Sequence, residues 1–370
     1  MKPKLTYIVS NIDKALAFEW VALYLDKNKF DLSFILLNPD KSYLQSFLEK
    51  NDIPVLWIPY EGKKDFIKSI FKIYFYLKKN KIKTVHTHLF DANIVGLLAA
   101  KLVGIKNRIH TRHHGSQNHT YFPRAVFYDK IINRLSTKII AISENVKNIL
   151  INWENAKSKK VVTIRHGFDL TFFKNHNKLK INEIKASYNP RSSKLVFGVI
   201  ARYTHLKGIQ YIIPAFKKVL EKHPAAHLIL ANTQGDYQAE IKKLLTEIPK
   251  KNYTEIVFEQ DIATLYQVFD YYIHTPINNH SEAFGQTYVE ALASGIPSIF
   301  TLSGVANEFI KNEKNALVVN YQDSEDIYQK MMMLIDNKPV IEDLIENGKT
   351  SVKQFELNPF IENLTKLYLE

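Results

Sequence analysis

The 370-residue sequence contains no cysteine, only 12 glycines and no run of 18 consecutive apolar residues. The absence of cysteine excludes a disulfide framework, a thiolate metal site and a cysteine nucleophile, and it fits a reducing compartment. The absence of a long apolar run argues against a membrane-spanning helix, and Asp13 interrupts the N-terminus too early for a signal peptide. We therefore expect a cytoplasmic protein.

The residues that are present indicate a globular chain with an uneven charge. Hydrophobic residues make up 46% and charged residues 24%, and the length predicts two domains. Residues 1–200 carry 34 Lys and Arg against 15 Asp and Glu, whereas residues 201–370 carry 16 against 22. The halves therefore have net charges of +19 and −6, so we expect the first half to face an anionic partner.

Short β-rich runs alternate with helical patterns along the chain, which is typical of parallel sheets with helices on both faces. The alternation restarts at residue 194, after a polar segment at 172–193 that we interpret as a domain junction. The expected strands are 5–10, 30–38, 55–59, 84–88, 108–113, 138–143, 160–167, 194–202, 227–232, 255–259, 270–276 and 296–301. The sequence thus predicts an α/β protein of two Rossmann-like domains, residues 1–172 and 173–355, facing a central cleft.

The segment 281–299 contains two glutamates separated by seven residues. Glu282 precedes a predicted helix that starts near Phe284 and Gly285, and Glu290 lies inside it. Carboxylates accept hydrogen bonds from sugar and ribose hydroxyls, and a helix N-terminus favours phosphate or sugar oxygens. A surface helix with two solvated glutamates is the alternative, but the flanking glycine, phenylalanine and Ser-Gly-Ile-Pro turn favour a binding site.

A second candidate lies at the end of the strand that opens the second half. Arg202 follows this strand, and Lys207 and Gly208 directly precede a predicted helix. The planar guanidinium of Arg202 can bind two phosphate oxygens, and Lys207 adds a compact positive charge. The carboxyl end of a parallel strand is the usual ligand position in such sheets, which favours diphosphate binding over two solvated cations.

With these residues the chain resembles the family 4 glycosyltransferases, which are retaining nucleotide-sugar enzymes with the two-domain GT-B fold. The resemblance covers essentially the whole chain and rests on segments 85–104, 110–115, 141–150, 164–173, 200–208 and 282–299. It implies that Arg202 and Lys207 bind the donor diphosphate, that Glu290 holds the ribose and that Glu282 contacts the transferred sugar. The implied donor site also includes Ala283, Phe284, Gly285, Asp261 and Ile262.

The family resemblance has further implications for the first domain. The family's last helix returns to that domain, so we expect residues 356–370 to pack on it. Many relatives have a Gly-Gly pair in the first loop, but residues 10–15 of this chain contain no glycine. Acceptor-side candidates are Asn11, His88 and His114.

The segment 110–114 is rich in histidine, and Thr111-Arg112-His113 resembles the family's catalytic histidine motif. A neutral imidazole there can hydrogen-bond the donor sugar. His114-Gly115 matches a variant of the motif, so the choice between His113 and His114 stays open. The catalytic candidates are His113, Arg202, Lys207 and Glu282.

We expect no metal ion and no cofactor. Glu259 and Asp261 form an acid-x-acid pair that could hold Mg²⁺, but they lie where the family places the loop beside the nucleotide base. Ribose, base or structural roles are therefore favoured for this pair. The histidines lack a partner at the ligand spacing of a helical metal site.

The segment 63–83 combines eight lysines with apolar residues at helical spacing. We expect a core-facing stripe, with extra aromatic residues among the lysines that could contact an anionic membrane. A solvated lysine-rich face is the alternative, and no nucleic-acid motif is present. The predicted stripe consists of Ile67, Ile70, Phe71, Tyr74 and Leu77, with Phe66, Ile73 and Phe75 outside it.

The resemblance, together with these features, implies a retaining hexosyltransferase that moves a sugar from a UDP-sugar to a glycan or lipid-linked acceptor in cell-surface polysaccharide biosynthesis. The resemblance implies front-face attack, in which the leaving phosphate takes the acceptor proton. The protein could sit peripherally on the inner face of the cytoplasmic membrane. The alternatives are a nucleotide-sugar epimerase of the same fold and a non-catalytic polyanion-binding protein.

Overall fold

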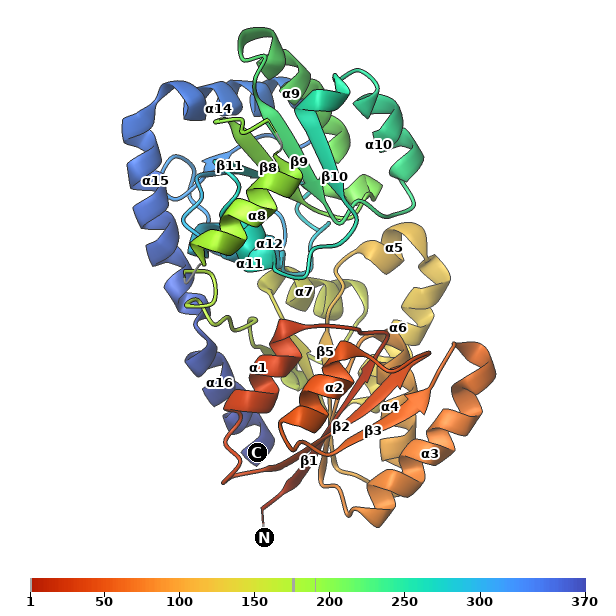
Figure 1. Cartoon of the computed structure of the whole chain (residues 1–370). Coiled ribbons are helices and arrows are strands. Elements are labelled where there is room, and N and C mark those ends of the chain that lie inside the picture. Colours follow the sequence, from red (N-terminus) through yellow and green to blue (C-terminus); the bar gives the residue numbers. More distant parts are fainter. Residues whose placement is uncertain (1, 175–176, 190) are drawn as a thin grey trace. The chain divides into compact units, whose positions relative to one another are not determined.

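The computed structural model describes residues 2–174, 177–189 and 191–370, so part of the junction expected at 172–193 lies outside the described residues. The chain divides into two compact units (Figure 1). The first unit is Met1–Phe168 with Leu357–Glu370, and the second is Asp169–Glu356. The structural division thus falls four residues before the boundary expected after residue 172.

The first unit contains a seven-stranded sheet in the order β3-β2-β1-β4-β5-β6-β7, and all its strand pairs are parallel. The order reverses between β1 and β4, so the loops after these two strands diverge at the carboxyl edge, where ligands bind in such sheets. The strands are β1 Lys4–Ser10, β2 Asp31–Asn38, β3 Val55–Pro59, β4 Thr84–His88, β5 Asn107–Arg112, β6 Lys138–Ala141 and β7 Val161–Thr163.

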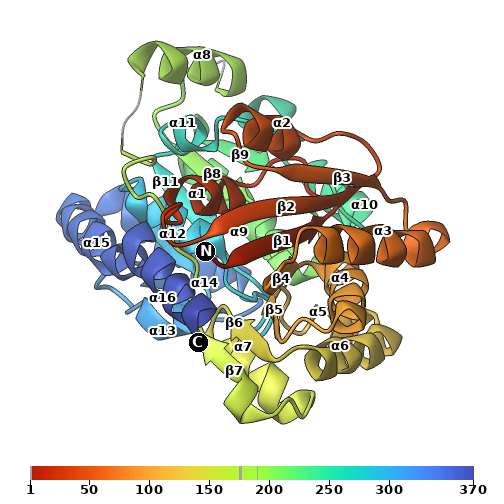
Figure 2. The ribbon, with the colours of Figure 1, turned by 90° about the horizontal axis from the view of Figure 1, so that it is seen from below.

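Helices cover both faces of this sheet, with α1 and α2 on one face and α3 and α4 on the other (Figure 2). The C-terminal helix α16 packs against α1 in the same unit, and Tyr368 of α16 hydrogen-bonds the Tyr7 hydroxyl of β1. The helices are α1 Leu16–Tyr24, α2 Tyr43–Lys50, α3 Phe66–Lys79, α4 Phe90–Val103, α5 Gln117–Tyr121, α6 Pro123–Leu135, α7 Glu144–Asn148 and α16 Leu357–Leu369.

The second unit contains a six-stranded parallel sheet in the order β10-β9-β8-β11-β12-β13. The order reverses between β8 and β11. The strands are β8 Val196–Ile200, β9 His227–Ala231, β10 Tyr253–Ile256, β11 Tyr271–His274, β12 Ser298–Phe300 and β13 Leu317–Val318. The helices are α8 Lys178–Tyr188, α9 Ile209–Lys222, α10 Gln238–Leu245, α11 Ile262–Tyr266, α12 Gln286–Ala293, α13 Ala306–Phe309, α14 Ser324–Asp336 and α15 Lys338–Ser351.

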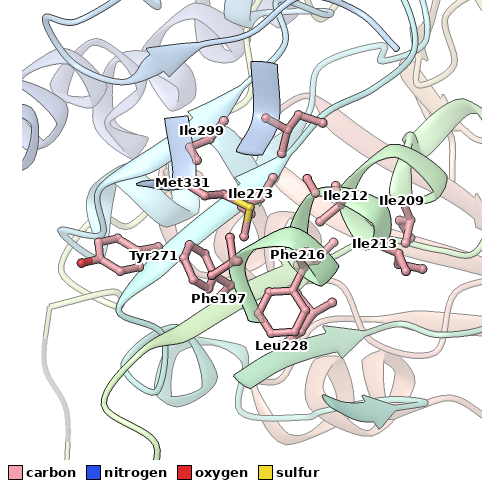
Figure 3. Packing of buried hydrophobic residues seen from close by; sticks show 14 of the residues in the cluster. Phe197, Ile209, Ile212, Ile213, Phe216, Leu228, Tyr271, Ile273, Ile299 and Met331 are labelled. Carbon is pink, nitrogen blue, oxygen red and sulfur yellow. The ribbon is translucent and has the colours of Figure 1, made fainter. Parts of the chain in front are cut away.

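The core of the second unit explains why the sequences of its central strands are continuous apolar runs. Phe197 of β8 packs on Phe216 of α9 and on Tyr271 of β11, and all three are buried (Figure 3). A parallel sheet covered on both faces buries the residues of both faces, so its strands are apolar throughout. This core fixes the carboxyl ends of β8 and β11 beside each other.

Several predicted boundaries were wrong. The strand expected at 160–167 is only Val161–Thr163, and the strand expected at 255–259 is Tyr253–Ile256, with Val257 and Phe258 exposed. The polar segment interpreted as a domain junction contains helix α8, which begins at Lys178, where the Asn177 side chain accepts a hydrogen bond from the Leu179 N–H. Ends of elements depend on such capping contacts more than on apolar periodicity.

The core-facing stripe predicted for α3 was right at Ile70 and Leu77 but wrong at Ile67 and Phe71, and it left out the buried Ile73. Ile70, Ile73 and Leu77 are buried, whereas Ile67 and Phe71 are 63% and 56% exposed. A helix with apolar residues around most of its circumference has two possible stripes, and packing on α4 selected the one that contains Ile73. The other stripe faces solvent. No helix in the described part of the chain is long and apolar enough to cross a membrane.

Candidate functional site

Charged side chains converge at the carboxyl edge of the second unit's sheet, where its strand order reverses. Lys207 lies between β8 and α9, and Glu282 lies between β11 and α12. The Lys207 ammonium contacts Glu282 Oε1 at 2.5 Å, and His274 Nε2 at the end of β11 lies 3.0 Å from the same oxygen. The two loops are thus joined by one buried carboxylate.

The electrostatics of this group favour an ionised Glu282. Burial by itself would raise the pKa of Glu282, but the Lys207 charge and the His274 hydrogen bond outweigh it and hold the pKa well below its usual range. Burial lowers the pKa of His274, against the opposing influence of Glu282. A neutral His274 therefore donates its Nε2–H to Glu282, and its Nδ1 has no partner among the described residues.

Close backbone packing brings the two loops together. Gly208 has φ +72°, and a Cβ at this position would lie 1.8 Å from the carbonyl oxygen of Thr275. Only glycine allows both this left-handed backbone and this approach. Gly208 therefore holds Lys207 beside the loop that carries Glu282.

Arg202, which follows β8, differs from Lys207 in its surroundings. Its side chain is exposed and forms no ion pair in the described ranges, whereas Lys207 is paired with a buried carboxylate. An ammonium has three N–H donors, so Lys207 keeps donors for a second anionic partner. The two cations could therefore bind one diphosphate, with Lys207 fixed and Arg202 adaptable.

Glu290 lies in α12 and is half-buried. The Tyr266 hydroxyl donates a 2.9 Å hydrogen bond to Glu290 Oε2, and burial raises the pKa of Glu290 to about 7. Gly285, at the N-terminus of α12, has φ +86°, which places the preceding backbone in a tight turn. Phe284 is buried against Phe355 and anchors this turn.

The acid-x-acid pair is engaged in local structure. The Asp261 side chain caps α11 by accepting a hydrogen bond from the Thr264 N–H, and Ile262 begins that helix. Glu259 accepts a hydrogen bond from the Tyr188 hydroxyl at 2.7 Å. Among the residues that the structure describes, no group of three or more His, Asp or Glu side chains could hold a metal ion.

In the first unit, buried histidines gather at the carboxyl edge of the sheet. His88 Nδ1 lies 3.0 Å from His113 Nε2, and the His113 ring stacks on His166 with centroids 5.6 Å apart. Burial lowers the pKa of all three, to about 4 for His166 and well below the usual range for His88 and His113. A cavity of about 30 Å³ lies among these rings.

The structure separates the two candidate histidines. His113 joins the histidine group, whereas His114 Nε2 lies 3.2 Å from Asp129 Oδ2. Asp129 also accepts a 2.6 Å hydrogen bond from the buried Arg112, which contacts Glu154 as well. His114 therefore belongs to a buried ionic network that joins β5 to α6.

Asn11, in the first loop, has φ +53°, a conformation that asparagine tolerates better than most residues. Its side-chain amide donates a 3.0 Å hydrogen bond to Asp91 Oδ2 of α4. The loop without glycine is thus held in a left-handed turn by a side-chain contact.

Three residues of these groups, His274, His166 and Tyr266, were not predicted from the sequence as site residues. His274 ends the apolar strand β11, and a polar side chain at a strand's carboxyl end was the available signal. His166 follows Arg165 beyond the end of β7, so it carried no such signal. Tyr266 gave no signal, because its hydroxyl reaches Glu290 only after α11 and α12 pack together.

Comparison with known proteins identifies the family. Residues 21–172 match the model for Glycosyltransferase Family 4, and residues 180–351 match the model for Glycosyl transferases group 1. Alpha-monoglucosyldiacylglycerol synthase of Acholeplasma laidlawii is 23% identical over 86% of this chain and 83% of its own. The UDP-Gal:alpha-D-GlcNAc-diphosphoundecaprenol alpha-1,3-galactosyltransferase of Escherichia coli is 24% identical over 94% of this chain and 90% of its own.

Solved structures support the fold. The crystal structure of Anabaena Alr3699/HepE in complex with UDP and glucose has a TM-score of 0.83 at 18% identity, covering 99% of each chain. Sucrose-phosphate synthase of Thermosynechococcus elongatus has a TM-score of 0.79 at 17% identity, covering 100% of this chain and 98% of the other. The two Rossmann-like units are those of the GT-B fold, and the chain belongs to the family 4 glycosyltransferases.

Proposed function

We propose that this glycosyltransferase transfers a hexose from a UDP-sugar, with retention of configuration, to a lipid-linked or polysaccharide acceptor in cell-surface glycan synthesis. The observation that carries the donor assignment is the pairing of Lys207 with the buried Glu282, in the same connection after β8 that carries the exposed Arg202. Cations at the sheet's carboxyl edge can stabilise the charge that develops on a departing diphosphate.

In this proposal the diphosphate binds Arg202 and Lys207 without a metal ion. The ribose hydroxyls donate to Glu290, and the backbone at Ala283–Gly285 meets the sugar. Glu282 acts mainly by positioning Lys207, because its Oε1 already accepts two hydrogen bonds. The neighbouring crystal structure that holds UDP and glucose supports a donor of this class.

The reaction itself needs no covalent enzyme intermediate. The acceptor oxygen bonds to the anomeric carbon on the face from which UDP leaves, and its proton passes to the leaving diphosphate oxygen. The resemblance assigns His113 to the transferred sugar. Because burial keeps the His113 imidazole neutral, it acts as a hydrogen-bond partner and not as a cation.

The acceptor assignment rests on the relatives and on charge. The names of two relatives specify a monoglucosyldiacylglycerol synthase and a transferase to a diphosphoundecaprenol-linked sugar, and a third is the capsular polysaccharide biosynthesis glycosyltransferase CapM of Staphylococcus aureus. Residues 1–200 carry a net charge of +19. A basic surface would attract a phosphate-linked acceptor and an anionic lipid surface alike.

We also propose that the first unit binds anionic membranes peripherally through α3. Its solvent-facing stripe, Ile67, Phe71 and Phe75, is 63%, 56% and 64% exposed, and exposed lysines flank it. Apolar residues among lysines are typical of surfaces that rest on anionic bilayers. This arrangement would keep the enzyme near a membrane-bound acceptor.

The test is a transfer assay with purified full-length protein, a panel of UDP-sugars and lipid-linked acceptors, run with excess chelator. We expect release of UDP and an α-configured product from an α-linked donor, at the same rate with and without chelator. Loss of activity in EDTA and its recovery with Mg²⁺ would contradict the metal-free site. An isomerised nucleotide sugar without acceptor would indicate an epimerase, and tight polyanion binding without donor binding would indicate the binding-protein alternative.

A further inference from the structure

The first unit contains a large groove that the donor and histidine sites do not use. It has a volume of about 870 Å³ and lies among the N-termini of α3 and α4 and the α5–α6 connection. This volume is within the range of small-molecule binding sites. Of its 13 lining residues only Lys63, Asp91 and Arg124 are charged.

The walls of the groove are aromatic and aliphatic. Phe66 and Ile67 contribute from α3, Phe90 and Ile94 from α4, and Phe122 and Tyr128 from α5–α6. Phe122 is 55% exposed and Tyr128 is 45% exposed, although both are large apolar side chains. A soluble surface rarely exposes such a contiguous patch unless something binds it.

The groove is continuous with the exposed stripe of α3. Ile67 belongs to both, because it lines the groove and begins the series Ile67, Phe71 and Phe75 at helical spacing. An apolar path therefore runs along α3 into the groove. A hydrocarbon chain that leaves a bilayer at the stripe would contact apolar side chains along this path into the groove.

The charged residues of the groove indicate which chemical group is attached to the hydrocarbon chain. Lys63 and Arg124 line it and form no ion pair in the described ranges, so two cationic donors are available to an anion. Arginine is rare in this sequence, with seven residues in the chain, and its fork binds phosphate in two contacts.

Asp91 gives the groove a polar end. Its carboxylate accepts hydrogen bonds from the Asn11 amide at 3.0 Å and from the Tyr60 hydroxyl at 3.4 Å. Asn11 follows β1 at the carboxyl edge of the sheet. The apolar groove therefore connects to the sheet edge on which an acceptor sugar would lie.

We propose that this groove binds the hydrocarbon chain of a phosphate-linked lipid acceptor, with Lys63 and Arg124 contacting the phosphate. The inference rests on the proposed function, because it names the class of acceptor for the same enzyme. The proposed occupant is one extended hydrocarbon chain inside the groove, which goes beyond contact between α3 and the bilayer surface.

The probe is farnesyl diphosphate below its micelle concentration, titrated against the full-length protein by calorimetry, with farnesol and inorganic pyrophosphate as comparisons. We expect farnesyl diphosphate to bind more tightly than either. Ala125 lines the groove on α6, so Ala125→Trp fills it. Affinity should fall about ten-fold or more, since each excluded methylene group contributes several-fold.

A matched control places the same indole elsewhere on the helix. Phe127 is 65% exposed and is not among the lining residues, so Phe127→Trp should leave farnesyl diphosphate affinity unchanged. Arg124→Gln should reduce affinity for farnesyl diphosphate but not for farnesol. UDP affinity should be the same in all three variants, which shows that they fold.

Several outcomes would overturn the proposal. These are equal farnesyl diphosphate binding by wild type and Ala125→Trp, no binding by either, or equal affinity for pyrophosphate. Binding to anionic vesicles without binding of the monomeric lipid would indicate a bilayer contact only. Farnesyl diphosphate binding in the groove without any UDP-sugar binding would leave the groove assignment intact and contradict the proposed function.

Discussion

Lys207 and Glu282 lie 75 residues apart in the chain, yet the Lys207 ammonium contacts Glu282 Oε1 at 2.5 Å. The side chain of Glu282 is 9% exposed and that of Lys207 is 21% exposed, so the pair is largely shielded from water. Its removal should therefore affect stability as well as ligand binding, unlike changes at the exposed Arg202.

Replacing Lys207 with Met should destabilise the protein by roughly 3–5 kcal/mol, because it leaves a buried carboxylate without its cation. The pKa of Glu282 should rise, since the Lys207 charge helps to hold it down. Thermal unfolding measures the change. The double variant Lys207→Met with Glu282→Gln should recover much of the stability but not the UDP affinity. A Lys207→Met variant as stable as wild type would contradict the buried pairing.

Replacing Arg202 with Ala should weaken UDP binding and turnover by about 2–4 kcal/mol, the cost of losing one charge-stabilising contact. Thermal stability should be unchanged, because Arg202 is exposed and unpaired in the described part of the chain. Arg202→Lys should restore activity only in part, since the planar fork is lost. Calorimetry and steady-state kinetics measure both effects, and unchanged kinetics in the Ala variant would remove Arg202 from the site.

Donor affinity should depend on the ionisation of Glu290. The pKa of Glu290 is raised to about 7, so half of the molecules lack the carboxylate near neutral pH. If only the ionised form accepts the ribose hydroxyls, affinity should fall about ten-fold between about pH 8 and about pH 6. UDP-glucose is the suitable probe because both of its phosphates are esterified and do not titrate in this range. Glu290→Gln should remove the pH dependence, and an unchanged slope in that variant would assign the titration to another group.

The histidine group should make the first unit sensitive to acid. The folded-state pKa of His166 is lowered to about 4. That of His86, which is buried on β4 beside His88, is lowered to about 3, while histidines of the unfolded chain take up protons near pH 6.5. Their stabilising effect is therefore present above pH 6.5 and is lost as the pH falls toward 4. Each histidine contributes up to about 1.4 kcal/mol per pH unit in this window.

Reversible thermal unfolding between about pH 7 and about pH 5 tests this expectation. Unfolding temperatures should drop steadily on acidification. His166→Gln should make the free energy of unfolding depend less steeply on pH, because one fewer proton is taken up on unfolding. A flat profile over this range would show that the buried rings take up protons without unfolding.

Membrane binding should depend on the lysines of α3 and of the turn that precedes it. Anionic vesicles should pull the protein down at low salt and neutral vesicles should not, because each lysine near an anionic surface contributes about 1 kcal/mol within a Debye length. Equal pelleting with both vesicle types, or with neither, would contradict the proposal. The test variant replaces Lys63, Lys64, Lys68 and Lys72 with Gln, and the control makes the same change at Lys242, Lys243, Lys250 and Lys251 of the second unit.

The sequence by itself determined the architecture of the two units. Alternating short apolar runs and helical patterns force parallel strands joined by helices, because only that arrangement buries both faces of each sheet. The positions of Arg202, Lys207 and Gly208 also followed from the sequence, since a residue after a buried strand must lie at the sheet's carboxyl edge.

Tertiary packing decided what periodicity left ambiguous. On α3 two apolar stripes were possible, and only the contact with α4 selected Ile70, Ile73 and Leu77 for burial and left Phe71 in solvent. Likewise the family resemblance implies a sugar contact for Glu282, but the pairing of Glu282 with Lys207 follows only from the packing of Gly208 against Thr275. A contact between residues so distant in the chain depends on how the loops close over the sheet, and local sequence does not encode that geometry.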